Sequence, residues 1–268
     1  MMKTALITGA SGGIGRAFTD IFANEGYQVV LASRNESKLL EVEQQLKERY
    51  GASTLSVPVD LAHSSGPQQL FEAVKRRGIE VDVLVNNAGI GSFGYLHQQN
   101  PALELNMLQL NVTSLSHLMM LFLPDMIKRK NGHILNIGST TSFYPCPLSA
   151  NYSASKAFVL SLTEAAANEL QGTGVQVTAL CPGATSTAFF KSAQMDRQKV
   201  SDPDAVMDPA KVARIGFDAL MGGKTVVVPG IQNWLFTQAP RFFPRKLVTS
   251  ITRRVLEQPL SFKTEIEG

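Results

Sequence analysis

Residues 5–18 read ALITGASGGIGRAF, an apolar run followed by a loop with glycines at positions 9, 12, 13 and 15 and then an amphipathic segment. Side chains in such a loop would keep the backbone away from a bound pyrophosphate, and some turns need the dihedral freedom of glycine. A tight strand-to-helix turn without a ligand would also contain glycines. The apolar run before the loop and the amphipathic segment after it favour a phosphate-binding loop at a helix N-terminus.

The rest of the chain repeats this alternation of a short apolar run and a longer amphipathic segment. The apolar runs are apolar on both faces and rich in β-branched residues, which predicts strands covered on both sides. They lie at 4–8, 27–33, 53–59, 81–87, 132–139, 175–183 and 225–230. Helices are predicted at 14–25, 36–49, 66–77, 102–129, 150–171 and 209–221. This order predicts an α/β fold, a doubly wound parallel sheet of about seven strands with helices on both faces.

Three residues mark expected helix ends. Asn35 is expected to cap the helix at 36–49, and Gly51 is expected to end it. Pro124 lies inside the stretch 102–129 and is expected to kink or end that helix, because proline has no backbone N–H and clashes with the preceding turn.

The composition excludes several classes of protein and site. The 268 residues carry a net charge of +3, which is too small and too scattered for a nucleic-acid interface. Cys146, Cys181 and the four histidines show no disulfide framework and no metal-ligand spacing, so we expect no metal and a reducing, cytoplasmic location. The N-terminal run is typical of a strand rather than a signal peptide, and no uninterrupted apolar run reaches the roughly 18 residues of a membrane span.

The glycine loop has the spacing T-G-x-x-x-G-I-G, and further motifs follow in order. They are VDL (59–61), NNAG (86–89), Asn111, Ser139, Y-x-x-x-K (Tyr152 to Lys156) and PGATST (182–187). In this combination the sequence resembles the short-chain dehydrogenase/reductase family along nearly its whole length. The resemblance implies a single Rossmann-type domain that transfers a hydride between a nicotinamide cofactor and an alcohol or carbonyl.

The resemblance also implies which residues hold the cofactor. The glycine loop would hold the pyrophosphate, VDL the adenine, NNAG the adenine ribose, PGATST the nicotinamide end and Lys156 the nicotinamide ribose. The predicted cofactor-binding residues are Gly9, Ser11, Gly13, Ile14, Gly15, Ser33, Arg34, Asp60, Leu61, Asn87, Ala88, Gly89, Tyr152, Lys156, Pro182, Gly183 and Thr187. Without a ligand, several of them would be ordinary turn or cap residues.

The end of the second predicted strand distinguishes NADP(H) from NAD(H). An acidic residue there bonds the ribose 2′-hydroxyl, whereas an arginine accommodates a 2′-phosphate. This chain has Ser33 and Arg34 at that place and no acid, which favours NADP(H) over NAD(H). An arginine that merely lies at the surface is the alternative. Many NADP-dependent relatives also carry a basic residue before the second motif glycine, and here that position is Gly12.

The predicted catalytic residues are Asn111, Ser139, Tyr152 and Lys156. Tyr152 could donate the proton that a reduced carbonyl needs, and Lys156 lies one helical turn on, where its charge is expected to lower the phenol pKa of about 10. Ser139 follows a strand and could donate a hydrogen bond to the substrate oxygen. Asn111 is expected to bend its helix and to hold a water of the proton relay to Lys156. Solvated helix faces and strand-end turns are the alternatives for each residue taken singly.

Three loops are expected to border the substrate, at 91–100, 140–150 and 188–208. Their aromatic and aliphatic residues favour an apolar ketone or aldehyde, as in carbonyl or 3-oxoacyl reductases, although loops often carry some aromatics. Cys146 lies in the second loop, as a reactive thiol or as a small space-filling residue. The alternative function is a non-catalytic NADP(H)-binding sensor or scaffold.

The alternating pattern ends after residue 230. We therefore predict a cofactor-binding and catalytic domain at 1–230 and a basic, aromatic extension at 231–268 that packs on this domain or on a partner. The extension would act as a lid or packing element; contact with a membrane surface is the alternative. By the resemblance, a homodimer or homotetramer would form on the helices that carry Asn111 and Tyr152.

Overall fold

The computed structural model describes residues 2–187 and 206–257. The loop predicted at 188–208, with Phe189, Phe190 and Met195, lies almost wholly outside the described residues, as does the end of the chain from residue 258.

A seven-stranded parallel sheet forms the centre of the molecule, in the order β3-β2-β1-β4-β5-β6-β7. Its strands are β1 (Thr4–Thr8), β2 (Gln28–Ser33), β3 (Thr54–Pro58), β4 (Val83–Asn86), β5 (Gly132–Ile137), β6 (Val175–Leu180) and β7 (Val226–Val227). The strand order reverses beside β1, which pairs with β2 on one side and β4 on the other. Parallel sheets bind ligands outside their carboxyl ends at such a reversal.

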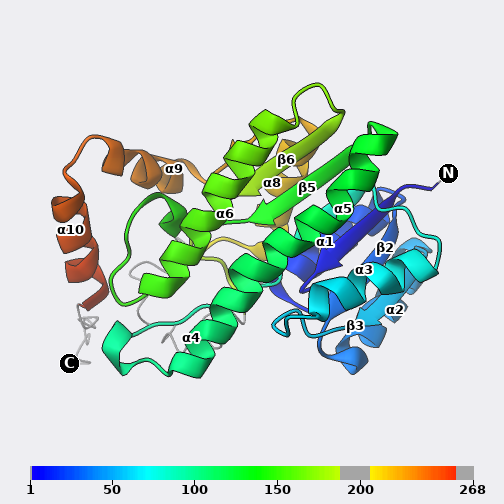
Figure 1. The fold of residues 1–268 in the computed structure, drawn as a ribbon, viewed down its shortest axis with the longest axis horizontal. Coiled ribbons are helices and arrows are strands. Elements are labelled where there is room, and N and C mark those ends of the chain that lie inside the picture. Colours follow the sequence, from blue (N-terminus) through cyan, green and yellow to red (C-terminus); the bar gives the residue numbers. More distant parts are fainter. Residues whose placement is uncertain (1, 188–205, 258–268) are drawn as a thin grey trace, which may run out of the picture.

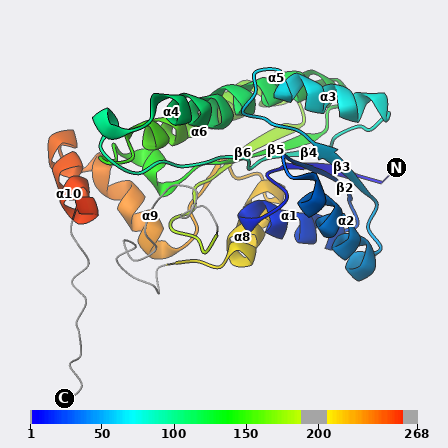
Figure 2. The same cartoon turned by 90° about the horizontal axis from the view of Figure 1, so that it is seen from below.

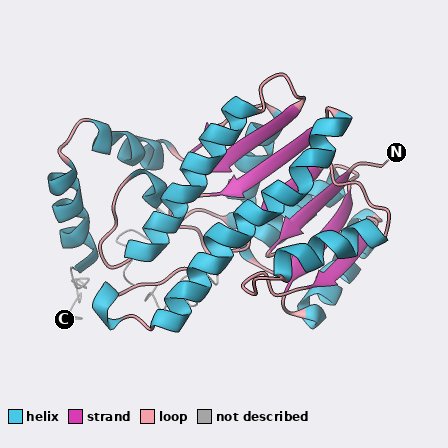
Figure 3. Cartoon of the chain, in the orientation of Figure 1, coloured by secondary structure: helices cyan, strands magenta, loops and turns pink. Residues whose placement is uncertain are grey.

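Helices cover both faces of the sheet, as predicted (Figures 2 and 3). One layer holds α1 (Gly13–Asn24), α2 (Glu36–Tyr50) and α8 (Pro209–Met221); the other holds α3 (Gly66–Arg76), α4 (Pro101–Leu108), α5 (Leu115–Arg129) and α6 (Ala150–Glu169). Neighbouring residues of β1 belong to different hydrophobic cores. Ile7 packs in the core under the first helix layer and Leu6 in the core under the second, and both are fully buried. The double burial explains why the strand sequences are apolar on both faces.

The predicted ends of α2 are confirmed. The side chain of Asn35 accepts a hydrogen bond from the backbone N–H of Lys38 at 2.9 Å, and Gly51 ends the helix with φ at +61°.

Pro124 was predicted to kink or end its helix; it does not end it, because α5 continues to Arg129, and a kink stays a prediction. Pro124 lies on the exposed side, where water can hydrate the carbonyl that it leaves without an N–H partner. The irregularity comes earlier, at the π-helix η2 (Gln109–Ser114) between α4 and α5. The stretch Pro101–Arg129 is apolar enough, by length and composition, to cross a membrane, but here it covers the sheet with Phe122 and Met126 buried.

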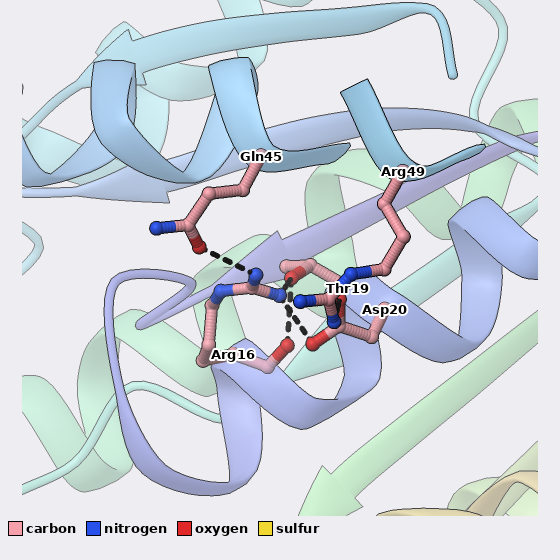
Figure 4. Close-up of polar contacts among 5 residues, drawn as sticks. All are labelled: Arg16, Thr19, Asp20, Gln45 and Arg49. Atoms are coloured by element: carbon pink, nitrogen blue, oxygen red, sulfur yellow. Dashed lines mark hydrogen bonds and ion pairs between the residues drawn. The ribbon is translucent and has the colours of Figure 1, made fainter. Parts of the chain in front are cut away.

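A cluster of polar contacts joins α1 to α2 just after the glycine loop (Figure 4). The Arg16 guanidinium donates to Gln45 Oε1 at 2.9 Å and to Thr19 Oγ1 at 3.0 Å, and it also pairs with the carboxylate of Asp20. Arg49 approaches the same carboxylate at 3.7 Å. Arg16 therefore ties the two helices together.

After β7 the described chain is helical and leaves the layered body. It forms α9 (Ile231–Gln238), the short η6 (Ala239–Arg241) and α10 (Arg245–Glu257). Figures 1 and 2 show α10 at the periphery, beyond α9 and outside both helix layers.

Candidate active site

A cavity of about 690 Å³ lies at the carboxyl ends of the strands, beside the reversal of strand order. It has the size of a cofactor or ligand site. Most of the predicted site residues line it: Gly9, Ser11, Gly13, Ile14, Arg34, Asn87, Ala88, Gly89, Ser139, Tyr152, Lys156, Pro182, Gly183 and Thr187. Five predicted residues do not line it: Gly15, Ser33, Asp60, Leu61 and Asn111.

The glycine loop is folded tightly against the end of β4. Thr8 Oγ1 accepts hydrogen bonds from the backbone N–H groups of Asn87 and Ala88, both at 2.9 Å, and the Asn87 amide donates to Thr8 O at 2.8 Å. A Cβ on Gly15 would lie 2.3 Å from Gly9 O and 2.4 Å from Asn87 Nδ2. Gly15 is therefore required for packing within the loop rather than for contact with a ligand.

Gly12 faces open space, since a Cβ built there meets no atom within 4 Å. With Ser11, Gly13 and Ile14 it forms the wall of the cavity at the N-terminus of α1. The small residues and the helix N-terminus fit a pyrophosphate. The loop thus leaves room for the pyrophosphate of a dinucleotide to approach its backbone.

Arg34 reaches the cavity from the end of β2, and its side chain is exposed. Ser33 instead turns its hydroxyl inward, where Oγ is buried without a hydrogen-bond partner among the described residues. The VDL motif also turns away from the cavity: Asp60 Oδ1 accepts from Ala62 N at 2.9 Å, and the Leu61 side chain is buried in the core. Contacts of Ser33, Asp60 and Leu61 with a cofactor stay predictions.

Ser139, Tyr152 and Lys156 meet on one wall of the cavity. Ser139 follows β5, whereas Tyr152 and Lys156 lie one turn apart on α6. Lys156 Nζ donates to the carbonyl of Ile137 at 2.8 Å and lies 5.8 Å from the centre of the Tyr152 ring. Ser142 supports this wall, because its Oγ accepts from the backbone N–H of Ser139 at 3.1 Å.

Burial has the largest effect on the pKa values of the ionisable side chains in this wall. It raises the pKa of Tyr152 to about 12, against the opposing effect of a hydrogen bond with Ser139. It lowers the pKa of Lys156 to about 8, since burial disfavours the charged ammonium. In the protein alone, burial therefore sets the direction of the Tyr152 pKa shift, and the lowering expected from Lys156 together with an oxidised nicotinamide stays a prediction. Near neutral pH the phenol keeps its proton, which is the form that a proton donor needs.

Asn111 lies behind this wall, in the π-helix η2, so the predicted local distortion of its helix is confirmed. Its Oδ1 accepts from Ile90 N at 3.0 Å, and its Nδ2 donates to Ile90 O at 2.9 Å and to Ser155 Oγ at 3.2 Å. Asn111 is buried and holds the segment after Gly89 against α6. Its predicted water in a proton relay stays a prediction.

Residues after β5, after β6 and from the C-terminal extension also line the cavity. Tyr144 and Cys146 line it, as the loop prediction for 140–150 expected. Burial raises the pKa of the Cys146 thiol to about 11, so it is a protonated, space-filling residue at neutral pH. From the predicted loop 91–100, Gly91 and Ser92 line the cavity, whereas Tyr95 and Leu96 are exposed and do not line it.

Sequence reasoning missed three residues of the extension. Val255 and Leu256, near the end of α10, line the cavity, and Asn233 of α9 packs on the nicotinamide-end loop. A Cβ on Gly183 would lie 2.6 Å from Asn233 Oδ1. The amphipathic sequence pattern of α10 indicated an apolar contact but not where it would form. No sequence pattern indicated a contact for Asn233. Among the described residues, no group of three His, Cys, Asp or Glu side chains could hold a metal ion.

Relatives of known sequence support the assignment to a family. The sequence matches the family described as short chain dehydrogenase over residues 3–198. An uncharacterised oxidoreductase of Staphylococcus saprophyticus is 34% identical over 208 residues, 78% of this chain and 89% of that protein. Human very-long-chain 3-oxoacyl-CoA reductase is 30% identical over 246 residues, 87% of this chain and 76% of the reductase.

Solved structures show the same fold over nearly the whole chain. A short-chain dehydrogenase from Sphingobium yanoikuyae in complex with NADPH has a TM-score of 0.80 at 28% identity, covering 98% of this chain and 99% of its own. A bulky-bulky ketone specific alcohol dehydrogenase from Comamonas testosteroni has a TM-score of 0.76 at 26% identity, covering 98% of each chain. A short chain dehydrogenase/reductase from Burkholderia phymatum in complex with NAD has a TM-score of 0.82 at 26% identity, covering 97% of this chain and 98% of its own. On these matches and this geometry, the chain belongs to the short-chain dehydrogenase/reductase family of NAD(P)-dependent oxidoreductases.

Proposed function

We propose that this oxidoreductase transfers a hydride between NADP(H) and a carbonyl or alcohol, and that its substrate is an apolar ketone or aldehyde. The observation that carries the proposal is the meeting of Ser139, Tyr152 and Lys156 in one cavity with the glycine loop and Arg34. When bound, the nicotinamide supplies or takes the hydride. The protein must then place the carbonyl, provide a proton and stabilise the developing alkoxide.

Tyr152 is the proposed proton donor. Its raised pKa keeps the hydroxyl protonated near neutral pH, and the transfer goes to the carbonyl oxygen as the hydride adds to the carbonyl carbon. Ser139 would donate a hydrogen bond to the same oxygen and hold it near Tyr152. Lys156 would hold the nicotinamide ribose and provide the positive charge that stabilises a phenolate after proton transfer.

Arg34 supports NADP(H) as the cofactor. It lines the cavity where a 2′-phosphate would lie, and no acidic residue replaces it at the end of β2. Arg16, which follows the glycine loop on α1, already donates a hydrogen bond to Thr19 and pairs with Asp20. The solved relatives include one with NADPH and one with NAD, so the preference rests on Arg34.

The cavity wall supports an apolar substrate. Tyr144, Cys146, Val255 and Leu256 all line the cavity, and none of them has a charged side chain. The names of two relatives agree with this choice, since one reduces very-long-chain 3-oxoacyl-CoA and the other is specific for bulky ketones.

We further propose a cytoplasmic homodimer or homotetramer built on the helices of Asn111 and Tyr152. Met120, Ile127 and Phe158 are exposed on the outer sides of α5 and α6, which gives these helices an apolar surface to bury.

The test is a screen of NADPH oxidation over apolar ketones, aldehydes and 3-oxoacyl thioesters, repeated with NADH. We expect turnover of at least one class and faster turnover with NADPH. Equal rates with both cofactors would contradict the role of Arg34. Tight NADPH binding without turnover of any carbonyl would favour the sensor or scaffold instead.

A further inference from the structure

The described part of the C-terminal extension exposes apolar side chains that its own fold leaves uncovered. We call residues 231–257 the C-terminal surface. Phe242 is 81% exposed and Phe236 is 68% exposed. The other exposed large apolar residues there are Ile231, Trp234, Leu235, Phe243, Leu247, Ile251 and Val255. So dense an exposed apolar patch marks a surface that is covered in use.

The exposed residues of α10 share one face of that helix. Leu247, Ile251 and Val255 follow each other at intervals of four, which places them in one stripe along the helix. Val248 and Thr252 are half-buried on the neighbouring side. Leu247 and Ile251 thus present an exposed apolar face, and the stripe ends at Val255, which is exposed but also borders the cavity. Figure 2 shows α10 protruding beyond both helix layers.

The C-terminal surface is also cationic. Its basic residues are Arg241, Arg245, Lys246, Arg253 and Arg254, and its acidic residue is Glu257. Arg253 pairs with Glu257 at 2.7 Å. The remaining four form no ion pair with a residue that the structure describes. Arg254 flanks the apolar stripe, one residue before Val255.

We propose that the C-terminal surface docks on an anionic lipid surface. A protruding amphipathic helix with aromatic and basic residues can lie in the interface of a bilayer, its apolar stripe among the acyl chains and its cations at the headgroups. A two-fold contact with a second copy would bring the cations of one copy against those of the other. The lipid supplies the opposite charge and needs no matching shape.

The docked surface adjoins the active-site cavity. Val255 and Leu256 line the cavity, and Tyr95 Oη donates to Glu257 Oε1 at 2.8 Å, which ties the end of α10 to the loop beside the cavity. Docking would therefore hold this side of the cavity against the lipid, where an apolar carbonyl dissolves. That link to substrate rests on the proposed reductase function, whereas lipid binding does not.

The single tryptophan of the chain, Trp234, lies within the C-terminal surface and reports directly on docking. We expect its fluorescence to shift to the blue when the full-length protein is mixed with vesicles of phosphatidylcholine and phosphatidylserine. The protein should sediment with these vesicles, less so as NaCl is raised, and little with pure phosphatidylcholine. No substrate is present, so this result does not depend on turnover.

Two double variants separate the apolar and the electrostatic contributions. Leu247→Glu with Ile251→Glu should abolish sedimentation with the mixed vesicles. Arg245→Gln with Arg254→Gln should weaken the partition by about 25-fold, at about fivefold for each cation near an anionic surface. Leu40→Glu is the matched control, because Leu40 on α2 is 54% exposed and Ile251 is 55% exposed. This control should bind like the wild type.

The proposal is overturned if the wild type ignores the mixed vesicles at low salt, or if both double variants bind as it does. A change in oligomeric state caused by Ile251→Glu, with no vesicle binding by the wild type, would assign the surface to a second copy. Vesicle binding without turnover of any carbonyl would refute the reductase function and leave lipid docking standing.

Discussion

Replacing Lys156 with methionine should stabilise the protein alone at neutral pH while removing its activity. Lys156 is buried and its pKa is lowered from 10.5 to about 8 by the loss of hydration. Below about pH 8 the folded protein must therefore keep a buried charge that the unfolded chain exposes to water. Methionine has a similar length and no charge, so it removes this cost with little change in packing.

The size of the effect follows from the two pKa values. At about 1.4 kcal/mol per pKa unit, the buried charge costs about 3 kcal/mol at pH 7. Loss of the hydrogen bond from Lys156 to the carbonyl of Ile137 offsets about 1 kcal/mol of this. The net stabilisation of about 2 kcal/mol corresponds to a rise in Tm of roughly 4–8 °C in a chain of this size.

The sign depends on pH. As pH rises from about 8 toward 10.5, folded Lys156 loses its proton while the unfolded chain keeps it, so the wild type gains stability and the advantage of Lys156→Met disappears. Thermal unfolding of both proteins without cofactor, at pH 7 and near pH 10, measures this. Lys47→Met, at an exposed position on α2, should show no such dependence. A Tm of Lys156→Met at or below the wild type at pH 7 would refute the reasoning.

Three further substitutions test the loop and the site. Gly15→Ala should destabilise the protein alone by about 1–3 kcal/mol through its clash with Gly9 O, whereas Gly12→Ala should leave Tm nearly unchanged; equal effects in thermal unfolding would contradict the packing argument. Arg34→Ala should raise the KM for NADPH by about 10- to 100-fold, the value of a charged hydrogen bond, with little change for NADH; a parallel rise for both would argue against a 2′-phosphate contact. Ser139→Ala should lower kcat by about 10²–10³-fold, as for an oxyanion donor, and a change in KM alone would instead indicate a role in substrate binding only.

The fold could be predicted from the sequence because its signals are local and repeated. Strands buried on both faces must be apolar on both faces, and the seven apolar runs correspond to the strands β1 to β7 in order. Both ends of α2 were predicted from single residues, the start from Asn35 and the end from Gly51. That α5 continues past Pro124 could not be predicted, because the effect of a proline on helix continuation depends on whether the freed carbonyl meets water, which is a property of the packed structure.

The candidate site was predicted as a set of positions, but the directions of the side chains depend on tertiary structure. Gly15 and Asn111 proved to hold backbone segments in place, and Leu61 turns into the core. The raised pKa of Tyr152 could not be deduced from its spacing to Lys156, because burial outweighs their proximity. Val255 reaches the cavity only because the extension folds back on it.

The central claim is that Tyr152 gives the proton to the substrate carbonyl. The most direct test measures NADPH oxidation by Tyr152→Phe in a single turnover with a carbonyl that the wild type reduces, together with NADPH affinity by titration. Phenylalanine keeps the ring and removes only the hydroxyl. We predict a loss of at least about 100-fold in the hydride-transfer rate, the usual contribution of a general acid, with NADPH binding unchanged. A rate within tenfold of the wild type would contradict the proposed role of Tyr152.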